Sequence, residues 1–145
     1  KRKEFQKVDY EIILNAARKA HSCGAETISL ISAVGVKSGS FNFYMDIKGR
    51  VEEEIIDLGF KSVNIFRPGH LMGKGAASDW DVKLADFVSK ITDNFMFGPF
   101  SKFKSIDGNC LARSMVSETQ RNKPGVNYFY FNEIIQSLIS DTPSL

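Results

Sequence analysis

The sequence predicts an α/β fold in which a parallel sheet is flanked by helices. Two short runs of β-branched and aliphatic residues, 27–32 and 62–66, are typical of buried strands. The stretch between them, residues 42–58, has apolar positions at helical spacing. A strand, a helix and a strand over this distance form a βαβ unit, whose strands run parallel and whose crossover is right-handed.

Length and composition fit a single soluble domain. The 145 residues are 43% hydrophobic and 25% charged, which is sufficient for one core. Lys and Arg number 19 against 17 for Asp and Glu, and the scattered net charge of +2 indicates neither a nucleic-acid partner nor a membrane surface. No apolar run approaches the ~18 residues of a membrane span, and the opening KRKEFQK is not followed by the apolar segment of a signal peptide.

The two cysteines bear on the compartment. Cys23 and Cys110 are too few and too far apart for a metal site. In a chain without a signal peptide they are expected to be buried free thiols rather than a disulfide. We therefore expect a reducing, cytoplasmic compartment and no bound metal.

The first predicted helix begins at Asp9, a residue type that caps helices, after a charged and unpatterned stretch at 1–7. Basic residues in its last turn and Gly24 just beyond indicate where it ends. Its apolar stripe consists of Ile12, Ile13, Ala16, Ala17 and Ala20.

The remaining elements are predicted from similar signals. A polar loop at 33–41 leads into the helix 42–58, which Gly59 ends. Beyond the second strand we expect, in order, a turn at 67–69, a glycine-rich stretch at 70–78, a helix at 80–91, an aromatic loop at 94–103, a helix at 106–118, a turn at 122–125, a strand at 126–131 and a last helix at 132–139.

Tyr44 and Lys48 are the strongest candidates for chemistry. Residues four apart lie one above the other on the same helix face, so the phenol and the ammonium can share one small volume. A nearby cation favours the phenolate of a phenol whose unperturbed pKa is ~10, which would let Tyr44 pass a proton at neutral pH. Ser32 falls at the carboxyl end of the first strand, where open α/β sheets place their ligand crevices.

Four runs of residues carry a family resemblance: VDYE at 8–11, ISAVG at 31–35, FYMDIKGRVE at 43–52 and FRPG at 66–69. Taken together, from Val8 to about Phe131, they resemble the carboxyl-terminal half of the atypical short-chain dehydrogenase/reductases. The similar branch is that of the human Tat-interacting oxidoreductase and its fungal mitochondrial relatives. The resemblance implies that residues 1–145 form one incomplete Rossmann-like domain, from about its fourth helix onward, and it admits an association with mitochondria.

The resemblance also implies a cofactor, NADP or NAD, and roles for individual residues. By this likeness Tyr44 is the general acid or base, and Lys48 binds the nicotinamide ribose and lowers the pKa of the tyrosine. The Arg67, Pro68 and Gly69 turn matches a segment that passes close to the nicotinamide through its backbone.

One residue departs from the family pattern. The serine that polarises the substrate carbonyl in the family falls here at Ala33. Ser32 remains beside it, but adjacent strand residues point to opposite faces of a sheet. Only a rearrangement of the loop would let Ser38 or Ser40 replace the hydroxyl that is missing at Ala33.

The glycine-rich turn that holds the pyrophosphate in this family is expected to be absent, because the first glycine of the chain is Gly24. The 145 residues are then either a piece of a longer protein or a truncated product with a different role. Unpaired parallel strands would favour a homo-oligomer or pairing with another chain.

Two functions follow as alternatives. The first is an NAD(P)(H)-dependent oxidoreductase acting on a small carbonyl or alcohol, with hydride transfer at the nicotinamide and proton transfer by Tyr44. The second is a non-catalytic NAD(P)-binding or regulatory protein, which Ala33 and the missing phosphate-binding half favour. The other candidate residues receive structural interpretations: a loop at Gly73, Gly75 and Ser78, a helix-dipole contact at His21, an exposed or hydrogen-bonded His70, a solvated face at 52–54 and core aromatics at 128–131.

Overall fold

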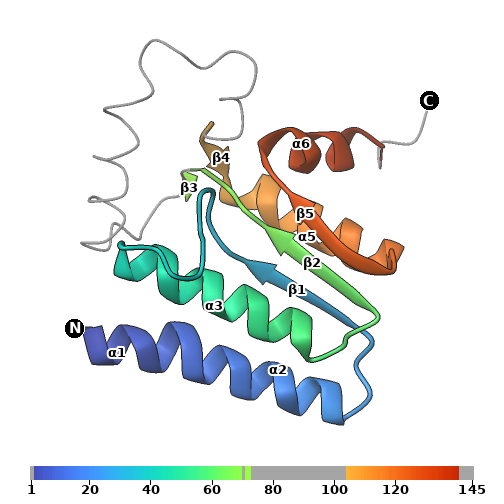
Figure 1. Cartoon of the computed structure of the whole chain (residues 1–145). Coiled ribbons are helices and arrows are strands. Elements are labelled where there is room, and N and C mark those ends of the chain that lie inside the picture. The colour runs from blue at the N-terminus through green and yellow to red at the C-terminus, as the bar shows by residue number, and fades with distance from the viewer. Residues whose placement is uncertain (1, 70, 73–103, 141–145) are drawn as a thin grey trace.

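The chain folds as a three-stranded parallel sheet flanked by helices, which confirms the predicted α/β class (Figure 1). The computed structural model describes residues 2–69, 71–72 and 104–140. The strands β1 (Thr27–Ile31), β2 (Ser62–Phe66) and β5 (Gly125–Phe129) lie in the order β1-β2-β5. Both pairings are parallel, as the βαβ pattern predicts.

Two helical segments cover one face of this sheet and run side by side in the same direction (Figure 1). The first is continuous through α1 (Arg2–Gln6), η1 (Lys7–Ile12) and α2 (Ile13–Ser22), and the second is α3 (Phe43–Asp57). Alternate strand residues point to this face, and their side chains join those of the helices in one apolar core. The core consists of Leu14, Ala17, Leu30, Val51, Ile55, Phe60, Val63 and Ile65.

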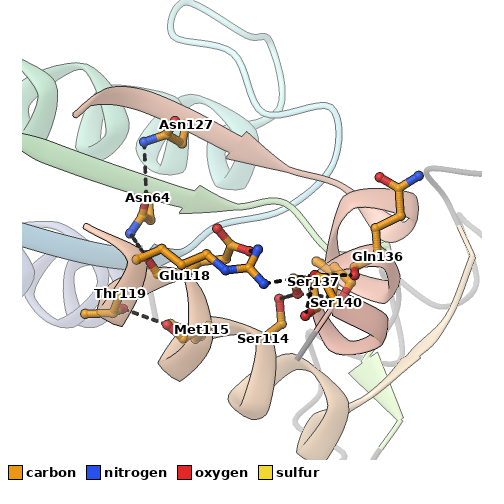
Figure 2. A network of polar contacts seen from close by, with 11 residues as sticks. Asn64, Ser114, Met115, Glu118, Thr119, Asn127, Gln136, Ser137 and Ser140 are labelled. Carbon is orange, nitrogen blue, oxygen red and sulfur yellow. Dashed lines mark hydrogen bonds and ion pairs between the residues drawn. The ribbon is translucent and has the colours of Figure 1, made fainter. Parts of the chain in front are cut away.

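The opposite face carries α5 (Gly108–Arg121), and α6 (Phe131–Ser140) packs beside it. A second apolar cluster lies at the carboxyl ends of β2 and β5, where the rings of Phe66 and Phe129 stack with centroids 4.6 Å apart. The cluster is completed by Ile106, Leu111 and Ile134. The hydroxyls of Ser114 and Ser137 lie 2.6 Å apart and join α5 to α6 (Figure 2).

A row of polar side chains crosses the middle of the same face. Ser29, Asn64 and Asn127 are register partners on the three strands. The Asn64 amide donates to the Ser29 hydroxyl at 3.4 Å and to the Glu118 carbonyl at 3.5 Å, and the Asn127 amide donates to Asn64 Oδ1 at 3.3 Å (Figure 2). Buried amides require such partners, so the row ties the three strands and α5 together in one register.

The prediction that the first helix begins at Asp9 is wrong. The helix already includes Arg2, and Asp9 lies within the π-helical turn η1. The reason is packing, since the ring of Phe5 lies 5.9 Å from that of Phe43 and 5.6 Å from that of Tyr44 on α3. One half-buried aromatic contact accompanies the extension of the helix through residues whose charges otherwise give no helical pattern.

Most other element boundaries agree with the predictions. The helix predicted at 42–58 is α3 with its two capping residues, and the strand predicted at 62–66 is β2. The helix predicted from 106 starts instead at Gly108, because Ile106–Asp107 form a short strand, β4, that pairs with β3 (Leu71–Met72). The predicted helix 80–91, the aromatic loop 94–103, His70 and the Gly73, Gly75 and Ser78 motif lie outside the described residues.

Three interpretations of burial need correction. Both cysteines are unpaired, as expected, but neither is buried: Cys23 is exposed and Cys110 is half-buried. Glu52 is 3% exposed rather than solvated, because it pairs with Arg67. Of the aromatics expected in the core, Phe129 is buried whereas Tyr128 is 41% exposed, since alternate residues of β5 face opposite sides.

Candidate functional site

The amino-terminus of α3 positions Tyr44. The side chain of Asn42 caps the helix and accepts hydrogen bonds from the backbone N–H groups of Tyr44 at 2.9 Å and of Met45 at 3.2 Å. Asn is among the strongest N-cap residues because its short side-chain oxygen reaches these otherwise unpaired donors. The cap therefore fixes where the helix starts and, one turn on, where Lys48 lies.

The loop that joins β1 to α3 rests directly on the helix backbone. A methyl group at Gly49 would lie 2.3 Å from the backbone nitrogen of Ser38 and 2.5 Å from the carbonyl carbon of Lys37. The loop is also held by the Gly39 N–H, which donates to Asp46 Oδ1 at 2.7 Å. Only glycine permits this approach, so the residue after Lys48 seats the loop against the helix that carries the reactive pair.

Tyr44 and Lys48 both contact the first helix. The Phe5 ring packs against the ring of Tyr44, and the Lys48 Nζ lies 2.7 Å from Asp9 Oδ1. The Lys48 side chain is 12% exposed and that of Asp9 is 28% exposed, so this ion pair is partly shielded from water. The first helix therefore contacts Tyr44 through the Phe5 ring and Lys48 through the Asp9 carboxylate.

Ser32 lies at the carboxyl end of β1, as predicted. It is 6% exposed, and its hydroxyl has no hydrogen-bond partner among the residues that the structure describes. Its backbone N–H donates to the Phe66 carbonyl at 2.7 Å, and the N–H of Val34 donates to the Pro68 carbonyl at 3.0 Å. Backbone pairing thus continues past β1 and joins the segment 32–34 to the segment 66–68, in which Pro68 is buried.

The Ala33 position is buried, at 4% exposure, and offers no hydroxyl. The two alternative serines, Ser38 and Ser40, are half-buried and lie in the loop between β1 and α3. The Ser40 hydroxyl accepts a hydrogen bond from the Asn42 N–H at 3.2 Å, and the backbone of Ser38 packs against Gly49. Ser32 is therefore the buried hydroxyl at this end of β1.

Arg67 connects α3 to β5. Its guanidinium pairs with Glu52, donates to the Tyr130 hydroxyl at 2.9 Å and lies 4.6 Å from the centre of the Tyr128 ring. Burial opposes the charged form, but the hydrogen bonds to Glu52 and Tyr130 outweigh burial and raise the pKa of Arg67 above its ordinary value. The Arg67 N–H also donates to the Phe129 carbonyl at 2.8 Å, so the groups described at this residue serve the scaffold.

A second set of polar contacts joins the first helix to α3, farther along both. The Tyr10 hydroxyl donates to Glu54, and Arg18 Nη2 lies 2.8 Å from the same carboxylate. The hydrogen bond to Glu54 is the main cause that raises the pKa of Tyr10, and burial adds to it. Arg50 lies 4.8 Å from the centre of the Tyr10 ring. These contacts hold the two helices parallel beyond the Asp9–Lys48 pair.

Sequence reasoning missed three residues at the site: Phe5, Asp9 as a partner of Lys48, and Glu52. A signal for the first two was present, because Phe5 and Asp9 are four residues apart, as are Tyr44 and Lys48. Equal spacing on two parallel helices allows two contacts on successive turns. Nothing in the sequence distinguished Glu52, because the run of three glutamates with Glu53 and Glu54 is typical of a solvated helix face.

Among residues 2–69, 71–72 and 104–140, no helix is long and apolar enough to cross a bilayer. Within the same ranges, no three His, Cys, Asp or Glu side chains come together in a way that could hold a metal ion.

No family model matches the chain. Its relatives include fungal proteins named "Protein FMP52, mitochondrial". The protein of Lodderomyces elongisporus is 33% identical over 127 residues, which are 84% of this chain and 51% of the relative. That of Candida glabrata is 30% identical over 141 residues, covering 92% and 60%, and that of Saccharomyces cerevisiae is 41% identical over 68 residues, covering 47% and 29%. The chain thus spans between 29% and 60% of the length of these three relatives.

These relatives correct two expectations. Their names are FMP52 and none of the three mentions a dehydrogenase or reductase, so the identification with the short-chain dehydrogenase/reductases is wrong and similarity to the FMP52 proteins replaces it. The same names carry the word mitochondrial, which overturns the expectation of a cytoplasmic protein.

Proposed function

We propose that this chain carries the proton-transfer part of an oxidoreductase site that uses NADP or NAD and acts on a small carbonyl or alcohol. The observation that carries the proposal is the buried hydroxyl of Ser32, which has no partner among the described residues. It lies at the carboxyl end of β1, the same end of the sheet from which the loop leads to Tyr44 and Lys48. The hydroxyls of Ser62 and Ser117 are also buried without a partner among the described residues, so the place of Ser32 at the end of β1, together with its unpaired hydroxyl, supports a ligand that would complete its hydrogen bonding.

The described residues fit one end of such a cofactor. Lys48 offers an ammonium with three N–H donors, which suits the hydroxyls of a ribose. Pro68 and Gly69 are buried, the Pro68 carbonyl accepts from the Val34 N–H two residues after Ser32, and we propose that this turn lines the space next to a flat ring. When bound, the nicotinamide donates or accepts a hydride.

Each residue has a separate task under this proposal. Tyr44 gives a proton to the oxygen of a carbonyl substrate, or removes one from an alcohol. Lys48 lies one helical turn away, and its positive charge stabilises the phenolate that Tyr44 becomes after giving up its proton. Ser32 donates a hydrogen bond to the substrate oxygen and so takes over the role that Ala33 cannot fill.

A second function, a protein that binds the nucleotide without turnover, is favoured by a specific contact. The Lys48 ammonium already has a carboxylate partner in Asp9, and Ala33 removes one polarising hydroxyl. Such a protein would retain nucleotide affinity but would not oxidise or reduce the substrates offered to it.

The test is calorimetric titration of the purified chain with NADPH and NADH, together with the Tyr44→Phe and Lys48→Ala variants. We expect wild-type binding, similar binding by Tyr44→Phe, and binding weakened about tenfold by Lys48→Ala. Turnover of a panel of aldehydes and ketones, followed by nucleotide absorbance, should disappear in Tyr44→Phe. Binding without any turnover would favour the second function, and no binding by the wild-type protein would refute both.

We also propose that this protein is mitochondrial, as the names of its relatives state for them. Fluorescence microscopy of the tagged protein with a mitochondrial marker tests this location. A diffuse distribution outside mitochondria would contradict it.

A further inference from the structure

We propose that Asp9 is a positioning residue, which holds the Lys48 ammonium in place beside Tyr44 for nucleotide binding. The inference rests on the proposed function, and it adds a residue from outside the helix that carries the reactive pair. It also assigns a role to the π-helical turn η1, in which Asp9 lies.

The ion pair is one of two contacts on successive turns. Phe5 meets Tyr44 and, four residues later, Asp9 meets Lys48, which itself follows Tyr44 by four residues. The two helices run in the same direction, so the contacts follow the same order on both (Figure 1). Tyr44 and Lys48 are thus each contacted by one side chain of the first helix.

The π-helical turn accounts for how Asp9 reaches Lys48. Asp9 and Tyr10 are neighbours in sequence, yet both contact α3, Asp9 through Lys48 and Tyr10 through Glu54. In a regular α-helix, consecutive residues diverge by ~100°, which disfavours contacts by both with one neighbouring helix. A π turn contains an extra residue and often marks a functional position.

Geometry leaves Lys48 available for a ligand. An ammonium has three donors, and Asp9 Oδ1 accepts one of them, at 2.7 Å. The carboxylate therefore restricts the rotation of a flexible side chain without using all of its hydrogen bonds. At 12% exposure Lys48 would otherwise be a desolvated charge, which a partner stabilises.

A purely structural ion pair is the alternative, and the chain contains a matched example. Arg18 and Glu54 join the same two helices at 2.8 Å, but their side chains are 52% and 37% exposed and lie farther from Tyr44. Exposed pairs contribute little to stability. Glu54→Ala is therefore the control, since it breaks contacts between the same helices without touching Lys48.

The experiment is a double-mutant cycle on nucleotide affinity with Asp9→Ala and Lys48→Met, with NADPH and NADH as the probes. We expect Asp9→Ala to weaken binding about tenfold in the wild-type background and less than about twofold in the Lys48→Met background. Asp9→Asn, which keeps an oxygen acceptor, should restore most of the affinity, and Glu54→Ala should leave it unchanged. An equal loss with and without Lys48, or no loss at all, would overturn the inference.

A second readout separates this inference from the proposed function. The acylation rate of Lys48 by an amine-reactive ester, mapped by mass spectrometry, should rise severalfold in Asp9→Ala and stay constant in Glu54→Ala. If the wild-type protein binds nucleotide but Lys48 reactivity is unaffected by Asp9→Ala, only the role of Asp9 fails. If the wild-type protein binds no nucleotide, the proposed function fails and the positioning role fails with it.

Discussion

The two faces of the sheet differ in chemistry. On the face that α2 and α3 cover, the strands present the apolar side chains of Leu30, Val63 and Ile65. On the α5 face they present a polar row, Ser29, Asn64 and Asn127. The first set stabilises the fold by burial, which a shift of one residue would lose but which requires no specific pair of atoms to meet. The second set forms hydrogen bonds that exist only when the three strands are aligned as observed. The α5 face thus combines an apolar cluster with a polar row that specifies strand alignment, whereas the α2 and α3 face contributes burial alone.

Removal of an apolar side chain should give the largest effect. Ile65 is fully buried in the core between the sheet and the two parallel helices. We expect Ile65→Ala to lower the free energy of unfolding by ~2–5 kcal/mol, through lost burial and the cavity that remains. Urea denaturation followed by circular dichroism measures this value. A loss below about 1 kcal/mol would show that the apolar face is not the main source of stability.

Removal of the Asn64 amide should lower the free energy of unfolding by less, and it should also loosen the alignment of the three strands. Asn64→Ala leaves the Asn127 amide, the Ser29 hydroxyl and the Glu118 carbonyl each without one partner. We expect a loss of ~1–3 kcal/mol from the lost hydrogen bonds, since the Asn127 amide still donates to the Lys123 carbonyl and the Ser29 hydroxyl keeps Thr119 as a partner. Amide hydrogen exchange should speed up in β1 and β5 as well as in β2, since the row spans all three strands. If exchange changed in β2 alone, the row would not set the register.

The smallest effect on the free energy of unfolding is expected from the Tyr10 to Glu54 hydrogen bond between the first helix and α3. This effect depends on pH. The pKa of Tyr10 is raised above the ordinary value of a tyrosine, chiefly by its hydrogen bond to Glu54. A raised folded-state pKa means that the hydroxyl stabilises the protein fully below pH ~10, and that this contribution is lost as the pH rises through the folded-state pKa. The difference in unfolding free energy between wild type and Tyr10→Phe should therefore be constant below pH ~10 and shrink above it. In a Glu54→Gln background the same comparison should show little dependence on pH.

The sequence predicted the fold better than the site. Short apolar runs and helical periodicity are local properties, and they placed β2 and α3 almost to the residue. The cap at Asn42 and the Tyr44 to Lys48 spacing are local too. The partners of Lys48 and Arg67 are not, because Asp9 is 39 residues from Lys48 and Glu52 is 15 residues from Arg67 in the chain. Such pairs depend on how helices pack, which periodicity does not determine.

Burial was the other property that the sequence did not determine. A run of three glutamates is typical of a solvated surface, yet Glu52 lies inside and pairs with Arg67. The β5 aromatics suggested a core strand, but helices cover only one of the two faces there, so Val126 and Tyr128 are each 41% exposed. In both cases the neighbouring element, rather than the residue type, decides the environment.

The π-helical turn has a consequence for insertions and deletions in this chain. The π-helical turn inserts one extra residue into the helix. Each residue of an α-helix turns the chain by ~100°, so the residues before the insertion face a direction ~100° away from the one they would face in a regular helix. Deletion of one residue within Lys7–Ile12 would restore a regular helix and turn Phe5 away from Tyr44, with every side chain of the pair still present. At this position the number of residues, as much as their chemistry, determines which side chains meet.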